Sequence, residues 1–250
     1  MKNAKVNRLS VIVYFIVAIT LSGVFRFQLV DWYKDLSIPF GLTGFKYLLE
    51  GIGPLAGALL VLKLFRKKSS ISLFGTSIKN SIIMIAVPVI LFSIFGAKNG
   101  HGLNPHYYGF IIGVIIALYG IFEETGWRGY LQDELAELKP FWKYLIIGIL
   151  WYAWHLSFIS PDTTLLNELK FFGILILASW GIGQIAEKTK SVIASACFHI
   201  IGNILSFSPL LATALEDRQR YIIFAIALII WIYIVNTWDK KAAPVSHTNL

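Results

Sequence analysis

Two adjacent glutamates, Glu123 and Glu124, follow residues 107–122, a stretch without any charged residue. Ionisable side chains are costly to place in or beside a membrane-length apolar segment, so such a pair indicates a functional site. If the segment continues as a helix, Glu124 and Arg128 are four residues apart and can form an ion pair. Glu123 is rotated by about 100° from Glu124 around the helix and can point into the interior of a bundle. The plainer interpretation is a polar helix end solvated at the membrane surface.

Two histidines and an asparagine in later apolar stretches could meet these carboxylates. His155 closes the run FWKYLIIGILWYAWH, with Trp151 one turn before it. His199 and Asn203 are four residues apart in SVIASACFHIIGNILSF, so a helix places both on one face. Lipid offers such a pair no hydrogen-bond partner, so it needs polar groups from other helices. The structural alternatives are a hydrogen-bonded core histidine at 155 and an interhelical hydrogen bond at 199 and 203.

A carboxylate, two imidazoles and a carboxamide from three separate segments are suited to hydrolysis. The glutamate can act as a general base, or it can join the histidines as a ligand of a metal that activates water. One histidine can hold or share that water, while the other histidine and the asparagine can donate hydrogen bonds to an oxyanion. Ser157, Ser195 and Cys197 are present as nucleophiles, but none lies in the sequence context of a nucleophile turn.

The composition indicates that these segments cross a membrane. Hydrophobic residues make up 56% of the chain and charged residues 14%, whereas soluble domains have about 45–50% and about 25%. A helix that spans a bilayer needs about 20 mostly apolar residues. The sequence therefore predicts an all-α polytopic membrane helix bundle of about eight transmembrane helices, at residues 9–27, 43–64, 80–97, 106–126, 141–159, 170–186, 191–209 and 220–238.

The basic residues predict how the bundle is oriented. The net charge is +8, but the lysines and arginines lie in short clusters between apolar runs, as in cytoplasmic loops rather than on a nucleic-acid-binding face. We therefore expect a lipid bilayer and no nucleic acid as partner. With both termini inside, 15 of the 22 basic residues fall on the cytoplasmic side, which favours N-in, C-in topology and an even number of spans.

We expect one transmembrane domain over residues 1–238, with a motif-bearing core at about 105–210, and a polar, disordered cytoplasmic tail at 239–250. The first apolar run has no small-x-small cleavage site after it, so we expect a retained helix rather than a signal peptide. In the second span, Lys46 and Glu50 are spaced to pair at the outer end. Small residues and a proline after this pair allow close helix packing or a kink: Gly51, Gly53, Pro54 and Gly57.

The candidate residues can meet only if they lie at the same depth in the membrane. His155 lies about 21 Å into its span, measured from residue 141 at 1.5 Å per residue. Glu123 reaches a matching depth only if its helix continues well beyond Arg128. We therefore expect that helix to continue to about Leu135, without a break at Gly126.

Three motifs in this order resemble the CPBP intramembrane proteases, the CAAX protease and bacteriocin-processing (Abi) family. The first, Glu-Glu-x-x-x-Arg, is EETGWR at residues 123–128. The second, an aromatic residue before a histidine, is WYAWH at 151–155, with tryptophan where phenylalanine is usual. The third, His-x-x-x-Asn, is HIIGN at 199–203. The resemblance covers about residues 105–210, and the first hundred residues match only in being hydrophobic.

The resemblance implies a glutamate-dependent intramembrane endopeptidase. Glu123 would activate the attacking water, with His155 positioning the water or sharing its proton. His199 and Asn203 would stabilise the oxyanion, and Glu124 and Arg128 would hold the architecture of the site. No cofactor is indicated. A metal, if bound, would use Glu123, His155 and His199, but no thiolate set or His-Glu-x-x-His signature calls for zinc.

The resemblance also implies a substrate and a location. Family members cleave membrane-associated peptides or proteins, prenylated Cys-a-a-X proteins among them, or are associated with bacteriocin immunity. We expect a multi-pass protein of a bacterial cell membrane with its active-site cavity toward the cytoplasmic side. Two alternatives remain: a non-enzymatic immunity or adaptor protein on the same scaffold, and a transporter, which is less favoured because no inverted repeat is visible.

Overall fold

The computed structural model describes residues 6–30, 42–100, 102–207 and 209–238. Over this part of the chain the fold is all-α, with a single isolated bridge between Ser72 and Ser191 and no strand. Its elements are α1 Arg8–Arg26, α2 Leu42–Leu64, α3 Ile78–Phe95, α4 Pro105–Glu124, η2 Thr125–Gln132, α5 Pro140–His155, η3 Ser157–Ile159, α6 Leu165–Thr189, α7 Val192–Gly202, η4 Asn203–Phe207, α8 Pro209–Ala214 and α9 Asp217–Asn236.

Six of these helices are long and apolar enough to cross a membrane: α1, α2, α3, α4 continued by η2, α6 and α9. The other two predicted spans correspond to shorter helices. Residues 141–159 contain α5, with 16 residues, and residues 191–209 contain α7, with 11 residues continued by η4. The polytopic membrane bundle is thus confirmed, while the number eight and the N-in, C-in orientation stay predictions. The predicted tail at 239–250 lies outside the described residues.

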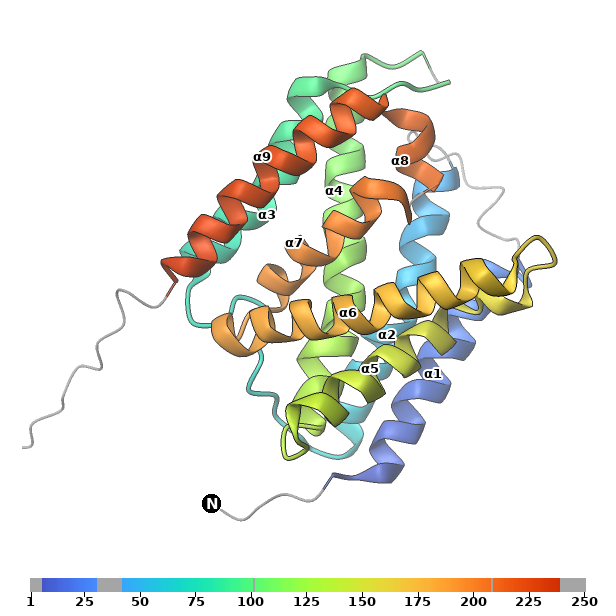
Figure 1. The fold of residues 1–250 in the computed structure, drawn as a ribbon, viewed down its shortest axis with the longest axis vertical. Helices are drawn as coiled ribbons and strands as arrows, with labels where there is room; N and C mark the ends of the chain where they lie inside the picture. Colours follow the sequence, from blue (N-terminus) through green and yellow to red (C-terminus); the bar gives the residue numbers. More distant parts are fainter. Residues whose placement is uncertain (1–5, 31–41, 101, 208, 239–250) are drawn as a thin grey trace, which may run out of the picture.

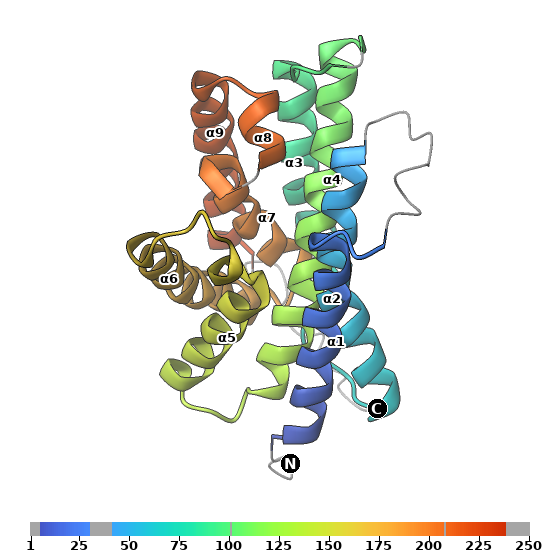
Figure 2. The same cartoon turned by 90° about the vertical axis from the view of Figure 1, so that its right-hand side faces the viewer.

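Helix α4 stands upright at the centre of the molecule beside α2 (Figures 1 and 2). Helices α5 and α6 run side by side across one flank, α3 and α9 cover the other, and α7 passes between them against α4. Buried side chains form two main clusters. One joins α3, α4, α7 and α9, and the other joins α1, α2, η2, α5 and α6.

Local sequence signals fix the ends of the helices that carry the motifs. Helix α4 begins at Pro105, where the missing N–H costs nothing, and the Asn104 side chain accepts hydrogen bonds from the first free backbone N–H groups. Helix α7 begins behind Ser191, whose hydroxyl accepts from the backbone N–H of Ala194 at 3.1 Å. Helix α5 ends at His155 because Leu156 adopts a left-handed conformation with φ 55°. His155 therefore sits at a helix terminus.

Close packing was expected around Gly53 and is observed there. A Cβ added at Gly53 would lie 2.2 Å from the backbone oxygen of Ala18, so α1 and α2 are in contact at a spacing that no larger residue permits. The predicted Lys46–Glu50 pair is also present, with Nζ and Oε1 3.8 Å apart.

The helix that carries the glutamates continues past Gly126, as expected, but its hydrogen-bond pattern changes. Residues Thr125–Gln132 form the π-helix η2, and helical structure then extends through Glu134. A π segment makes i→i+5 hydrogen bonds and is frequent at functional sites. The prediction of an unbroken helix to about Leu135 agrees with the structure, and the π form is an addition that the 3.6-residue pattern of apolar residues does not reveal.

Candidate active site

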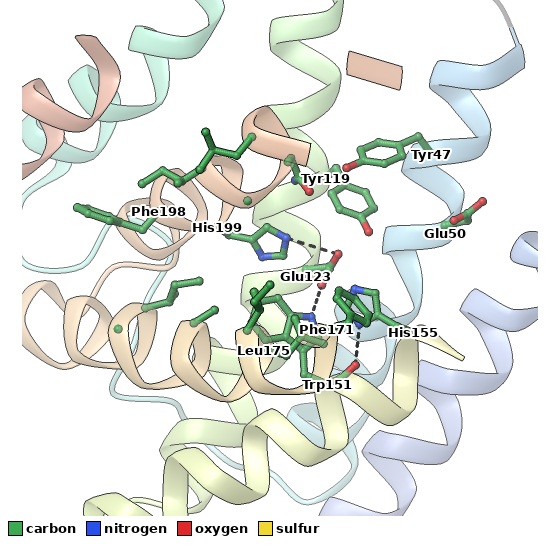
Figure 3. A pocket seen from close by; sticks show the side chains of 18 of the residues that line it. Tyr47, Glu50, Tyr119, Glu123, Trp151, His155, Phe171, Leu175, Phe198 and His199 are labelled. Carbon is green, nitrogen blue, oxygen red and sulfur yellow. Dashed lines mark hydrogen bonds and ion pairs between the residues drawn. The ribbon is translucent and has the colours of Figure 1, made fainter. Parts of the chain in front are cut away.

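A cavity of about 750 Å³ lies between α2, α4, α5, α6 and α7, and all four predicted catalytic residues line it. They come from three helical segments: Glu123 from α4, His155 from α5, and His199 and Asn203 from α7 and the start of η4. The close-up in Figure 3 shows Glu123 between His199, Trp151 and His155. Much of the remaining wall is apolar and comes from α6 and α7.

The two oxygens of the buried Glu123 carboxylate have different surroundings. Oε2 accepts hydrogen bonds from two indole N–H groups, Trp151 Nε1 at 2.9 Å and Trp127 Nε1 at 3.2 Å. Oε1 has no hydrogen-bond partner among the described residues and lies 3.7 Å from His199 Nε2. The side chain of Tyr119 also points toward this carboxylate (Figure 3). One oxygen is therefore fixed by the protein, and the other faces the cavity.

His199 connects both glutamates. Its Nδ1–H donates to Glu124 Oε1 at 2.7 Å, and its Nε2 faces Glu123. Such a hydrogen bond fixes the orientation of the imidazole ring and the proton on Nδ1. His199 can then donate a hydrogen bond from Nε2 only when the ring carries both protons.

The predicted pair between Glu124 and Arg128 is present, with Arg128 Nη1 and Glu124 Oε1 3.0 Å apart and both side chains fully buried. The Arg128 guanidinium also lies over the Trp151 ring, 4.8 Å from its centre. Glu124 is thus more than a partner of Arg128, because the same Oε1 atom receives the hydrogen bond of His199. The sequence analysis assigned Glu123 to the reaction and Glu124 only to the architecture of the site. The contact between Glu124 and His199 makes that assignment incomplete.

His155 is held by its own helix and by aromatic rings. Its Nδ1–H donates to the carbonyl oxygen of Trp151 at 2.8 Å, which leaves Nε2 as the nitrogen available to the cavity. The ring packs edge-on against Trp154 and Phe171, with centres 4.9 and 5.0 Å away. Arg26 Nη1 closes this helix end by donating to the carbonyl oxygens of Trp154 and His155 at 2.6 and 2.8 Å.

Asn203 occupies the first position of η4, one turn after His199. Its side chain is nearly buried, its Nδ2 has no hydrogen-bond partner among the described residues, and it lines the cavity. A buried amide N–H without a partner is costly. This N–H is therefore available to a ligand in the cavity.

Reasoning from the sequence missed three residues of this site. Trp127 is four residues after Glu123, a spacing that could have identified it as a donor to that carboxylate. Tyr119 is four residues before Glu123 on α4, so the same spacing could have identified it. Arg26 carries no comparable signal, because its partners at the end of α5 come from another helix.

The alternative of a metal held by Glu123, His155 and His199 finds no matching arrangement of side chains. Over the described part of the chain, no group of three or more His, Cys, Asp or Glu side chains is arranged to hold a metal ion.

The segment that lines the cavity is similar to known proteins. Residues 104–205 match the family model of the type II CAAX prenyl endopeptidase Rce1-like proteins. The CAAX prenyl protease 2 of Methanococcus maripaludis is 29% identical over 140 aligned positions, which cover 51% of this chain and 49% of that protein. The chain thus spans about half the length of this curated relative. The family match contains all three motifs and the four residues that meet in the cavity. The motif-bearing segment of the chain, residues 104–205, is thus similar to the CPBP/CAAX protease family.

Proposed function

We propose that the protein is an intramembrane endopeptidase that hydrolyses a peptide bond in a membrane-associated peptide or protein. One observation carries the proposal: Glu123 is buried at a cavity wall, with one oxygen fixed by two indole donors and the other unpaired and facing His199. A general base must lie within reach of the proton that it removes. The unpaired Oε1 meets this condition for a water in the cavity.

In the proposed reaction, Glu123 Oε1 removes a proton from this water as the water oxygen attacks the scissile carbonyl carbon. The carbon–oxygen double bond becomes a single bond, and its electron pair forms an oxyanion. Doubly protonated His199 donates from Nε2, and Asn203 donates from Nδ2, to this oxyanion. Preorganised donors of this kind stabilise charge that develops in the transition state.

The tetrahedral intermediate then collapses with cleavage of the carbon–nitrogen bond. The proton held by Glu123 returns to the departing amine. In the earlier attack step, the Nε2 atom of His155 positions the water and shares its proton. Glu124 and Arg128 act indirectly. Their ion pair holds the start of η2, and Glu124 keeps the His199 ring turned toward Glu123.

The shape and lining of the cavity support a membrane-associated substrate. Its apolar wall includes Phe171, Ile174 and Leu177 of α6 and Phe198 and Ile201 of α7. Binding sites of several hundred Å³ lined mainly by apolar side chains, with a few convergent polar groups, are typical of sites that take apolar ligands. A lipid-modified or hydrophobic peptide segment fits this lining.

The test compares wild-type protein with Glu123→Gln, which keeps the shape of the side chain and removes its basicity. Membranes from cells that produce each variant are analysed by mass spectrometry for new peptide termini, and cleaved peptides are then assayed with purified protein. General-base catalysis contributes about 10²- to 10⁴-fold, so we expect Glu123→Gln to lose cleavage by that factor. Glu137→Gln, at an exposed position, is the matched control and keeps wild-type activity.

A wild-type protein that cleaves nothing, or a Glu123→Gln variant with full activity, contradicts the proposal. If a biological phenotype of the wild type persists undiminished in Glu123→Gln, the result favours the non-enzymatic immunity or adaptor role.

A further inference from the structure

The side chain of Tyr119 lies between α4 and α2, beside the Glu123 carboxylate. Tyr119 is four residues before Glu123 on α4, so both side chains leave the helix on the same face. Both line the cavity, and the phenol oxygen of Tyr119 points toward the carboxylate (Figure 3). The hydroxyl and the carboxylate interact. Tyr119 is therefore placed to act on the group that the proposed reaction uses as its base.

Helix α2 holds the Tyr119 ring through two residues that are one turn apart. The ring of Tyr47 stacks on the ring of Tyr119, with centres 3.9 Å apart and planes inclined by 27°. A Cβ added at Gly51 would lie 2.8 Å from Tyr119 Cδ2 and 3.0 Å from Tyr119 Cε2. Tyr47 and Gly51 share one face of α2. This face therefore offers the Tyr119 ring a stacking partner and, one turn later, a space that any side chain would fill.

His199 contacts the same ring from α7. The ring centres of Tyr119 and His199 are 6.2 Å apart, and the planes are inclined by 84°. Such an edge-to-face contact is a favoured arrangement of two aromatic rings. Tyr119 is also almost completely buried. The ring is thus confined by α2 and by His199, and this confinement directs its hydroxyl toward Glu123.

Glu123 Oε1 is the oxygen that can accept a hydrogen bond from this hydroxyl. Two indole N–H groups already donate to Oε2, whereas Oε1 has no hydrogen-bond partner among the described residues. A carboxylate oxygen has two lone-pair sites, so Oε1 can accept from Tyr119 and still take a proton from a water. Hydrogen bonds in active sites are often long before substrate binds. A small approach of the hydroxyl is enough to complete this one.

We propose that Tyr119 is a positioning residue for Glu123, with its hydroxyl donating to Oε1, and that Tyr47 and Gly51 of α2 set the direction of this donor. The effect on catalysis rests on the proposed peptidase function, in which Glu123 is the base. The family match covers residues 104–205, so α2 lies outside it. The N-terminal part of the chain therefore contributes to the geometry of the site.

A double-mutant cycle with a cleaved peptide tests this proposal. Tyr119→Phe removes only the hydroxyl, whereas Gly51→Ala displaces the ring and keeps the hydroxyl. Hydrogen bonds to charged groups are strong, and a misplacement of about 1 Å in an active site can cost about 10²-fold. We expect each variant to lower kcat about tenfold or more with little change in KM, because the lost contact is to Glu123. In the Tyr119→Phe background, Gly51→Ala should change kcat little, since its effect passes through the hydroxyl.

Two control variants should keep the kcat of the wild type. Tyr108→Phe changes a buried tyrosine three turns earlier on α4, in the cluster with α3, α7 and α9. Gly173→Ala adds a Cβ in α6 with nothing within 4 Å of it. Full activity of Tyr119→Phe, or independent losses that multiply in the double variant, overturns the proposal. If Gly51→Ala does not fold, Tyr47→Leu takes its place in the cycle with the same expectation, because it removes the stacked ring.

Infrared spectroscopy of the purified protein separates this inference from the question of catalysis. The carboxyl band that disappears in Glu123→Gln belongs to Glu123, and its frequency depends on the hydrogen bonds that the group accepts. We expect Tyr119→Phe and Gly51→Ala to shift this band in the same direction, and Tyr108→Phe to leave it in place. An unshifted band in Tyr119→Phe contradicts the inference. If the wild type cleaves no peptide, the proposed function fails, and the band still decides whether Tyr119 donates to Glu123.

Discussion

The Glu123 carboxylate is the centre of the site because the protein treats its two oxygens differently. Two indole N–H groups fix Oε2, and Oε1 faces the cavity. The related motif usually has phenylalanine at the position of Trp151, and a phenylalanine ring has no hydrogen-bond donor. The tryptophan in this chain adds an indole N–H that can donate. Trp151 also supports the Arg128 guanidinium. Trp151 therefore helps to position both Glu123 and Arg128, the first and last residues of the Glu-Glu-x-x-x-Arg motif.

Trp151→Phe tests this role, because phenylalanine keeps an aromatic ring and removes the N–H donor. A hydrogen bond to a charged group contributes about 1.5–3 kcal/mol, and part of this should appear as a reduction in kcat of about tenfold or more. KM should change little, since the lost contact is to Glu123 and not to substrate. Steady-state kinetics with a cleaved peptide measures the effect.

Trp154→Phe is the matched control. Its indole N–H donates to Ala18 O and Ser22 Oγ instead of Glu123, so this variant should lower thermal stability and leave kcat nearly unchanged. Equal losses of kcat in the two variants would show that Trp151 acts through packing alone.

At the scale of the helix, η2 decides where the motif residues point. Gly126 lies at its second position, where a Cβ would meet Pro54 Cβ at 2.6 Å and Pro54 O at 2.8 Å. The α2 segment that contains Pro54 therefore packs directly on the backbone of η2. This contact explains why a glycine follows the two glutamates so closely.

Gly126→Ala should therefore destabilise the protein. Extra carbon in a packed interior typically costs about 1–3 kcal/mol, and here a backbone oxygen is among the atoms in the way. The measurement is thermal unfolding in detergent, with cleavage activity as a second readout because η2 also carries Trp127 and Arg128.

Gly173→Ala, in α6, provides the comparison, since nothing lies within 4 Å of a Cβ added there. It should be neutral or stabilise the protein by up to about 1 kcal/mol, the usual gain when alanine replaces glycine inside a helix. Equal stability of the two variants would argue against the close contact of η2 with α2.

For the whole molecule, polar contacts at the end of the bundle where α1 begins join segments that are distant in sequence. Glu134, just after η2, accepts from the backbone N–H of Asn7 at 2.7 Å and pairs with Lys67 of the α2–α3 loop. Its side chain is only 6% exposed. This one carboxylate therefore ties the start of α1 and the α2–α3 loop to the helix that carries Glu123.

Glu134→Gln removes the charge that both contacts use and should destabilise the fold by about 1–3 kcal/mol, the cost of weakening buried hydrogen bonds to a charged group. Thermal unfolding in detergent measures the loss. Glu137→Gln, an exposed position three residues later, should stay within about 0.5 kcal/mol of the wild type. A Glu134→Gln variant as stable as Glu137→Gln would show that this connection adds little.

The sequence by itself determined the fold class of the protein and predicted which polar residues line its cavity. Apolar runs long enough to cross a bilayer form helices there, because a helix satisfies its backbone hydrogen bonds within one segment and lipid supplies no partner. Glu123, Glu124, His155, His199 and Asn203 stood out because polar groups in such runs are rare. The Glu124–Arg128 pair followed from helical spacing alone.

Only the tertiary structure decided how these residues are connected. The bond from His199 to Glu124, the donors on Glu123 Oε2 and the closure of α5 by Arg26 join different turns or different helices. Periodicity along one helix does not encode such contacts, and it does not separate π from α turns. The cavity likewise depends on which helices meet, because its wall is assembled from α2, α4, α5, α6 and α7.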